Sequence, residues 1–275
     1  MENYDLHTHS TASDGTLTPE ELVNEAYRAG ITTLALTDHD TTAGLLRAKM
    51  AATKLGIRFI PGIELSTTWN GKNFHIVGLN INIDCPSLRH IINVIGSIRE
   101  RRALEISHNL NKHGINYALE GTLAIAGGGM ITRNHFARFL INEGYARNTR
   151  DVFKRFLVHN RPGSVKVIWP DLARAIECIK DARGIGIIAH PLSYKLTGSW
   201  MRKFLTEFRD VGGEGIEVVC GNSTPTNIQL ISNYARKFGL VGSIGSDFHG
   251  NNHDWDKLGI LKNLPSGIMP VWKTW

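Results

Sequence analysis

The sequence predicts an α/β fold, a distorted (β/α)7 barrel with a small helical insertion. Short, nearly continuous apolar runs alternate with helical segments, which is typical of a parallel sheet covered by helices on both faces. Seven such runs can be counted. Most of the candidate metal-binding side chains lie at or just after their ends, where barrels and open α/β sheets build their sites.

The first two predicted strands are each followed by a predicted helix. The first strand runs up to His9, and Thr18 followed by Pro19 marks a helix start, because a hydroxyl caps the first turn and proline fits the first helical position. Gly30 ends this helix. A strand over 33–36 and a helix from 41 to 56 repeat the unit.

The other predicted strands continue this rhythm with one interruption. They are expected at 57–60, running on into 63–66, and then at 74–79, 186–189, 215–219 and 240–244. Between the fourth and fifth strands the spacing is helical, and Arg and His are frequent. We therefore expect residues 1–98 and 167–275 to form the barrel, and residues 99–166 to form a helical insertion that is either a solvated lid or a surface that presents cations to phosphate.

The composition is that of an ordinary soluble enzyme. Of the 275 residues, 42% are hydrophobic and 20% are charged, and no apolar run is long enough to cross a membrane. The first residues lack a basic and apolar signal pattern, so we expect a cytoplasmic location. Cys85, Cys178 and Cys220 are scattered and odd in number, which favours reduced thiols over disulfides.

The formal net charge is +6, and carboxylates used as metal ligands would leave the rest of the surface more basic still. This balance suits a polyanionic substrate such as a nucleotide or nucleic acid, and it is equally compatible with a simple role in solubility.

Histidines and carboxylates gather in clusters along the chain. His7 and His9 are two residues apart in an extended segment, so they point to one face and can bind one metal ion. Asp14 could serve the same ion or a neighbouring one. The complete set of candidates is His7, His9, Asp14, Asp38, His39, Asp40, Glu64, His75, His190, Asp247 and His249.

These clusters resemble the motifs of the PHP (polymerase and histidinol phosphatase) superfamily, in order and over nearly the whole chain. The motifs are His7-Thr8-His9, Thr37-Asp38-His39-Asp40, Gly62-Ile63-Glu64, Phe74-His75, Ala189-His190-Pro191 and Gly245-Ser246-Asp247-Phe248-His249. The segments 10–15, 131–140 and 245–249 are similar to the narrower TrpH-like group of bacterial phosphoesterases, which includes an exoribonuclease and a 3′,5′-nucleoside bisphosphate phosphatase.

The resemblance implies three divalent metal ions. The first would be held by His7, His9, Glu64 and Asp247, the second by the bridging Glu64 with His75 and His190, and the third by Asp14, His39 and His249. Imidazole and carboxylate ligands suit Mn²⁺, Fe²⁺ or Zn²⁺ better than Mg²⁺ alone, and we favour manganese. Within this set, Asp14, Glu64, His190 and His249 are expected to be catalytic.

Other residues are expected to assist this centre. Arg133, Arg138 and Lys166 are predicted to hold phosphates that are not cleaved. His135 would either protonate a leaving oxygen or pack beneath the lid. Asp38 and Asp40 would orient imidazoles, although Asp38 could equally cap the following helix.

The predicted function is a metal-dependent phosphoesterase. Metal ions about 3.5–4 Å apart can activate a water and neutralise charge on phosphoryl oxygens. The expected substrates are 3′,5′-nucleoside bisphosphates, which would lose the 3′-phosphate, or RNA 5′ ends, degraded as by a 5′-to-3′ exoribonuclease. Alternatives are a phosphatase of a non-nucleotide metabolite similar to histidinol phosphatase, an accessory binding module, and an amidohydrolase. The sequence predicts no membrane association and no obligate protein partner.

Overall fold

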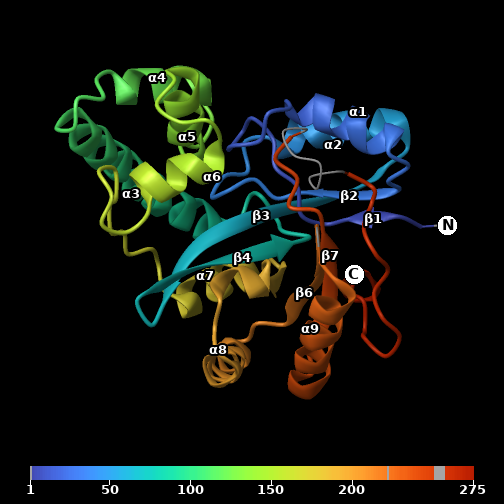
Figure 1. Cartoon of the computed structure of the whole chain (residues 1–275). Helices are drawn as coiled ribbons and strands as arrows, with labels where there is room; N and C mark the ends of the chain where they lie inside the picture. Colours follow the sequence, from blue (N-terminus) through green and yellow to red (C-terminus); the bar gives the residue numbers. More distant parts are fainter. Residues whose placement is uncertain (1, 222, 251–257) are drawn as a thin grey trace.

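The computed structural model describes residues 2–221, 223–250 and 258–275. Seven strands form one sheet in the order of the sequence (Figure 1). The backbone N–H of Leu6 donates to Ile244 at 3.1 Å and that of Asp247 donates to His7 at 2.9 Å, which brings the first and last strands together. The strands are β1 (Tyr4–Asp5), β2 (Thr33–Leu36), β3 (Arg58–Trp69), β4 (Lys72–Leu79), β5 (Ile185–Ile188), β6 (Gly215–Cys220) and β7 (Val241–Gly245). The predicted distorted barrel of seven strands is confirmed.

The sheet is mixed, so the expectation of a parallel sheet is wrong for one strand. β4 runs antiparallel to both β3 and β5. The cause is local: β3 and β4 are joined by Asn70 and Gly71, both at positive φ (46° and 72°). Such a two-residue turn can only connect antiparallel strands, whereas a parallel pair needs a long crossover. The Asn-Gly pair was a sequence signal for this hairpin.

The helices that cover the barrel follow the sequence signals closely. α1 (Pro19–Arg28) begins with a capping box between Thr18 and Glu21. α2 (Leu45–Leu55) begins later than expected, because the Thr41 hydroxyl instead accepts from the Ala43 N–H in a turn at 3.2 Å. Helices α1 and α2 pack together, and α7 (Leu172–Asp181), α8 (Gly198–Asp210) and α9 (Pro225–Phe238) lie across the sheet from them (Figure 1).

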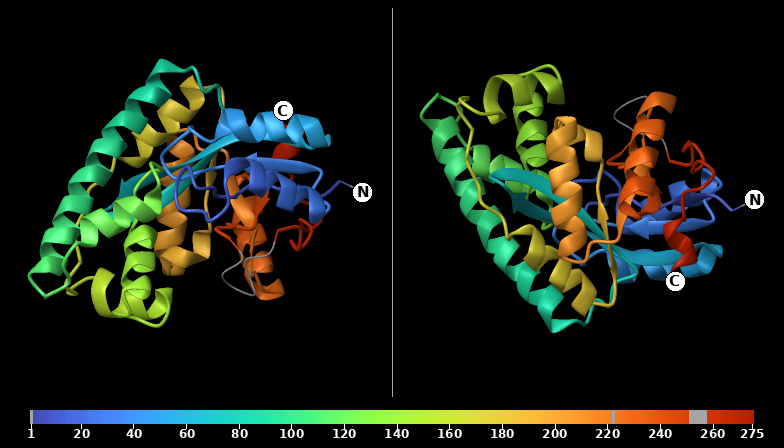
Figure 2. Two further views of the ribbon diagram at one scale, coloured as in Figure 1. Left: turned by 90° about the horizontal axis from the view of Figure 1, so that it is seen from above. Right: turned by 90° about the horizontal axis from the view of Figure 1, so that it is seen from below.

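The chain between β4 and α7 forms a separate group of helices. It contains α3 (Pro86–Asn111), α4 (Ala118–Ala126), α5 (Arg133–Asn142) and α6 (Thr149–Val152), which continues into a π-helical turn (Phe153–Leu157). These helices stand together to one side of the sheet in each view (Figures 1 and 2). The insertion therefore lies beside the barrel.

Helix α3 links the two parts of the molecule. Near its start, Leu88 and Ile95 pack in the barrel core, whereas further along Ile106 and Leu110 pack in a second apolar cluster with Phe136. The helix runs unbroken through residues 98 and 99, so both cores share one rigid rod. The division at these residues remains a proposal. None of the helices in the described ranges has the length and apolar character needed to span a bilayer.

Candidate metal centre

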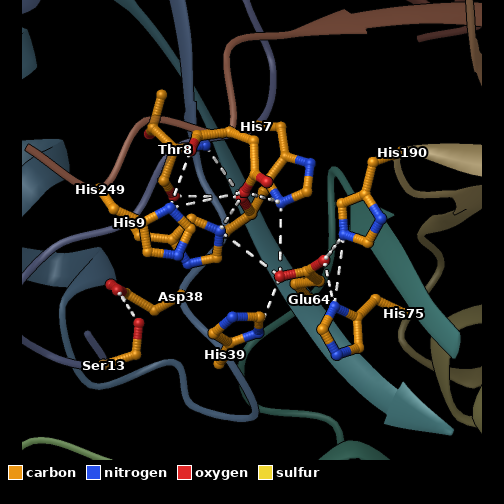
Figure 3. A network of polar contacts seen from close by, with 12 residues as sticks. His7, Thr8, His9, Ser13, Asp38, His39, Glu64, His75, His190 and His249 are labelled. Carbon is orange, nitrogen blue, oxygen red and sulfur yellow. Dashed lines mark hydrogen bonds and ion pairs between the residues drawn. The ribbon is translucent and has the colours of Figure 1, made fainter. Parts of the chain in front are cut away.

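The nine predicted metal ligands converge at one edge of the sheet. Figure 3 labels His7, His9, His39, Glu64, His75, His190 and His249 of this set. His7 and His9 follow β1, His39 follows β2, and Glu64 lies within β3. His75 lies near the start of β4, and because β4 is reversed, its start lies at the edge where the parallel strands end. The remaining ligands come from loops: Asp14 precedes α1, His190 follows β5, and Asp247 and His249 follow β7.

Glu64 lies at the centre of this cluster and is fully buried. Its Oε1 is 3.0 Å from His75 Nδ1 and 3.0 Å from His190 Nε2. Its Oε2 is 2.7 Å from His39 Nδ1 and 3.4 Å from the Nε2 atoms of both His7 and His9. Each carboxylate oxygen therefore faces a different set of imidazoles, as a bridging ligand requires.

The potential ligand atoms form three overlapping groups in which all atoms lie within 4.8 Å of one another. The first is His7, His9, Glu64 and Asp247, the same set as the first predicted site; the second is His39, Glu64 and His75; the third is His9, Asp14, His39 and His249. His190 stands beside the second group, since its Nε2 is 3.3 Å from His75 Nδ1. The structure thus brings all nine residues together.

Several polar atoms in this cluster are buried and have no hydrogen-bond partner within residues 2–221, 223–250 and 258–275. They include His7 Nε2, Asp14 Oδ1, Glu64 Oε2 and His249 Nε2. Buried polar atoms left unsatisfied destabilise a fold, and convergent ones indicate a group that satisfies them jointly. Imidazole nitrogen and carboxylate oxygen are the donors that divalent transition metals take. The residues present therefore fit metal ions.

The electrostatics of the cluster favour ionised carboxylates. Burial opposes the charge on Asp14, but His39 and His249 outweigh it and hold the pKa of this carboxyl well below its usual range. Burial also opposes protonation of His7, but its carboxylate neighbours, led by Glu217, raise its pKa well above the ordinary value. Anionic carboxylates are the form that binds a cation at neutral pH.

His9 behaves differently from His7. Burial and the nearby His249 and His39 lower the pKa of His9 to about 3. This imidazole is therefore neutral, which is the state in which histidine coordinates a metal.

Asp38 and Asp40 do not orient imidazoles, so that prediction is wrong. Asp38 accepts hydrogen bonds from the backbone N–H and hydroxyl of Ser10, both at 2.7 Å, and from the Ser13 hydroxyl at 2.6 Å. It fastens the loop between His9 and Asp14, and it does not cap α2, whose N-cap has no side-chain hydrogen bond. Burial raises the pKa of Asp38 to about 6.

Asp40 connects the barrel to the insertion. Its carboxylate accepts from Ser66 N at 2.6 Å and from Arg99 Nε at 2.7 Å, and Arg99 also donates to the Ile131 carbonyl at 3.1 Å. The backbone at Asp40 has φ 53°, so the chain turns there and the side chains of His39 and Asp40 meet different neighbours. The buried Arg99 thus has a structural role, in which its guanidinium joins Asp40 to the Ile131 carbonyl.

The predicted phosphate ligands occupy different surroundings. Arg138 donates to the backbone carbonyls of Asp14 and Gly15, and so holds the loop that carries the candidate ligand Asp14. Lys166 is exposed and does not line the cavity that Asp14, His39 and His75 line. The phosphate roles of these two residues stay predictions.

His135 is a buried helix cap. Its side chain is 1% exposed, and its Nδ1 accepts from the Thr132 N–H at 3.1 Å in a capping box at the start of α5. Burial lowers its pKa to about 4. The alternative in which His135 packs beneath the insertion is the one that these contacts support.

A cavity of 140 Å³ opens between the cluster and the insertion. Asp14, His39 and His75 line it, and so do Arg102 and Arg133. Among the hydrogen bonds of the described residues, neither guanidinium has a protein acceptor, and Arg102 Nε is a buried atom without a partner. The rings of Trp169 and Phe153 line the same space. The guanidinium groups of Arg102 and Arg133 lie over these two rings, so the cavity offers two cations, each held against an aromatic ring, next to the candidate metal ligands.

Sequence reasoning missed three residues of this centre. Asn134 Nδ2 donates to Asp14 Oδ2 at 2.9 Å, and Glu217 Oε1 lies 2.5 Å from His7 Nδ1. The position of Arg102 could have been predicted from the sequence, since it lies three residues after Arg99 and therefore on the same helix face. Glu217 could also have been noticed, because it lies within an apolar strand, where a carboxylate is rarely buried unless it is paired. Asn134 lies in the 131–140 segment but had no signal of its own.

Comparison with known proteins gives a consistent result. The chain matches the PHP domain family over residues 5–158. It is 45% identical over 270 residues to a Haemophilus influenzae protein named 5′-3′ exoribonuclease, and the match covers 98% of each chain. It is 36% identical over 274 residues to the 3′,5′-nucleoside bisphosphate phosphatase of Chromobacterium violaceum, covering 99% of this chain and 96% of that one.

A solved structure agrees with the fold over the full chain. An amidohydrolase from Chromobacterium violaceum, determined with bound sulfate and no metal, superposes with a TM-score of 0.94 at 36% identity. The superposition covers 99% of this chain and 95% of that one.

Proposed function

The chain belongs to the PHP family, and from this premise we propose that it is a metal-dependent phosphoesterase acting on 5′-phosphorylated nucleotides. The bond that it cleaves is the phosphate ester on the 3′ oxygen of such a nucleotide, either in a 3′,5′-nucleoside bisphosphate or at the 5′ end of an RNA. The names of its relatives support both substrates.

The observation that carries the proposal is the cavity beside the ligand cluster. Arg102 and Arg133 line a space that the candidate metal ligands Asp14, His39 and His75 also line, and within the described part of the chain neither guanidinium has a hydrogen-bond acceptor. Arginine binds phosphate with two parallel N–H donors, and a buried guanidinium needs an anion to compensate its lost hydration. We assign these two residues to the phosphate that is not cleaved. The rings of Trp169 and Phe153 hold these guanidinium groups in place, with Arg102 Cζ 5.6 Å from the centroid of the Trp169 ring and Arg133 Cζ 5.3 Å from that of Phe153.

The nine ligands would hold three divalent ions, which we propose to be Mn²⁺. Bound there, such ions supply an activated water at neutral pH and neutralise charge on the phosphoryl oxygens. Asp14, Glu64, His190 and His249 would hold these ions next to the scissile phosphate. Asn134 would keep Asp14 in its orientation, since it donates to the carboxylate oxygen Oδ2.

One bond accounts for both proposed substrates. In a 3′,5′-bisphosphate the group on the 3′ oxygen is a terminal phosphate, and in RNA it is the phosphate that leads to the next nucleotide. Attack of water on that phosphorus releases inorganic phosphate in the first case and a shortened RNA with a new 5′-phosphate in the second. A 5′-mononucleotide is the other product in both cases, so the shortened RNA is again a substrate.

The test is a substrate panel with the Mn²⁺-loaded protein. It comprises a 3′,5′-bisphosphonucleotide, a 5′-phosphorylated RNA, the same RNA with a 5′-hydroxyl, and a sugar phosphate without a base. We expect 5′-mononucleotides from the first two and slow turnover of the others. Release of neither phosphate nor nucleotide from the first two would refute the proposal. We expect the reaction to take place in the cytoplasm.

A further inference from the structure

Glu217 is a buried carboxylate within β6 that belongs to none of the predicted ligand groups. Its side chain is 1% exposed. It pairs across the sheet with Ser243, and the register between β6 and β7 shifts between Glu217 and Val219. An irregularity of this kind re-aims side chains and is common beside active sites.

The two oxygens of Glu217 contact two different ligand histidines. Oε1 lies 2.5 Å from His7 Nδ1, and Oε2 accepts the backbone N–H of His190. The Cys220 thiol donates to Oε2 at 3.5 Å. One carboxylate thus connects the segment after β1 with the segment after β5.

The contact with His7 determines which ring nitrogen is free to bind a metal. With Nδ1 directed at a carboxylate, the proton stays on Nδ1 and Nε2 is left as the coordinating atom. His7 Nε2 lies 3.4 Å from Glu64 Oε2 and 3.4 Å from Asp247 Oδ1, in the middle of the first ligand group.

The contact with His190 acts on the backbone. His190 has φ 29° and ψ 60°, a strained conformation for a residue other than glycine. Such a conformation persists only where its surroundings hold it. Glu217 fixes the N–H, and the Ser193 hydroxyl lies 2.9 Å from His190 Nδ1. The ring is thereby held with Nε2 toward Glu64.

The charge of Glu217 is compensated through His7. Among the ion pairs of the described residues, Glu217 has His7 as its partner and neither Lys nor Arg. A carboxylate so deeply buried requires compensation. A divalent cation on the far nitrogen of His7 would provide it.

We propose that Glu217 is a positioning residue of the metal centre: it holds the His7 tautomer and the His190 backbone, and it thereby strengthens metal binding by the group of His7, His9, Glu64 and Asp247. The inference rests on the metal centre of the proposed function. It does not depend on which phosphate ester is cleaved.

Glu217→Gln is the decisive variant, because it keeps the size of the side chain and its acceptor for His190. Its amide donor would face His7 Nδ1 and force the opposite tautomer, with the ring proton on Nε2. Mn²⁺ binding is measured by calorimetry and elemental analysis. We expect affinity at one site to fall about 10- to 100-fold, with an unchanged far-ultraviolet circular dichroism spectrum.

Glu214→Gln is the matched control, since Glu214 is an exposed carboxylate three residues earlier. It should bind Mn²⁺ as the wild type does. Wild-type affinity and stoichiometry in Glu217→Gln would overturn the inference. If Glu217→Gln binds Mn²⁺ more weakly than the wild type, and the wild type hydrolyses no nucleotide, the inference is upheld and the proposed function is refuted.

A measurement on the unaltered protein keeps the inference testable if the variant does not fold. In the Zn²⁺-loaded wild type, nitrogen NMR of the His7 ring should show a proton on Nδ1 and coordination through Nε2. Coordination through Nδ1 would overturn the inference.

Discussion

The barrel and the insertion contribute different kinds of side chain to the same centre. All nine ligand candidates come from strands and loops of the barrel, whereas Arg102, Arg133 and Asn134 come from the helices of the insertion. The ligands sit on backbone held by neighbouring strands, and the arginines sit on helices with an apolar cluster of their own. The difference suggests that the barrel provides the chemistry and the insertion selects the substrate.

The two parts are nonetheless joined at defined points. Arg99 of α3 pairs with Asp40 of the barrel, while Asn134 and Arg138 of α5 hold the loop of Asp14. We therefore expect substitutions at the barrel ligands to change turnover, substitutions at the junction to change stability, and substitutions of the insertion arginines to change substrate binding.

The largest effect is expected in the barrel. Glu64→Gln keeps the size of the side chain but removes the charge that faces five imidazoles. Loss of a partner behind a ligand already costs about 10- to 100-fold, so loss of the bridging charge should lower kcat by more than about a hundredfold. The measurements are kcat and bound metal, with circular dichroism to show that the fold is kept. Full metal content with full turnover would contradict the bridging assignment.

The next largest effect tests the junction. Asp40→Ala leaves the buried Arg99 without its counter-charge, and breaking such a pair destabilises a protein by about 3–5 kcal/mol. Urea denaturation in the presence of a chelator measures the free energy of unfolding without a contribution from metal. The double variant Asp40→Ala, Arg99→Met should be less destabilised than Asp40→Ala. A single variant as stable as the wild type would show that the two parts are not coupled here.

The insertion should affect binding more than turnover. Arg102→Ala and Arg133→Ala each remove a charged donor to phosphate, which is worth about 1.5–3 kcal/mol, so KM should rise about 10- to 100-fold with a smaller change in kcat. The rise should vanish for RNA with a 5′-hydroxyl. Lys166→Ala tests the sequence prediction that Lys166 holds phosphate. Because Lys166 does not line the cavity, we expect the KM of this variant to equal that of the wild type.

The smallest effect concerns the stability of the insertion against acid. Folding keeps His135 neutral with a pKa of about 4, whereas the unfolded chain takes up its proton near pH 6.5. The unfolded state then binds more protons, so this part of the stability is complete above pH 6.5 and is lost as the pH falls toward 4. Between pH 7 and pH 5 the loss is about 2 kcal/mol.

His135→Gln should remove this dependence, since glutamine at the same position can accept from the Thr132 N–H. Unfolding free energies at pH 7 and pH 5 measure the change, and the exposed His108→Gln serves as the control. Equal pH sensitivity in His135→Gln and the wild type would show that His135 does not cause the loss.

Local sequence signals were sufficient for most of the fold. The seven apolar runs, the Thr18 cap and the closing glycines each act within a few residues, and the structure confirms the seven strands that they predicted. The extent of the first strand was wrong, because β1 ends at Asp5 and not at His9. The reversal of β4 was overlooked although Asn70-Gly71 announced it, because the other strands follow a parallel pattern.

The sequence by itself determined which side chains could bind metal, because ligand type and position at a strand end are local properties. The tertiary structure decided how these and the other polar groups are shared. It pairs Asp40 with Arg99 and Glu217 with His7, and among the described residues it provides no acceptor for Arg102 Nε. Such pairings join residues up to 210 positions apart, so they depend on packing that no local pattern encodes.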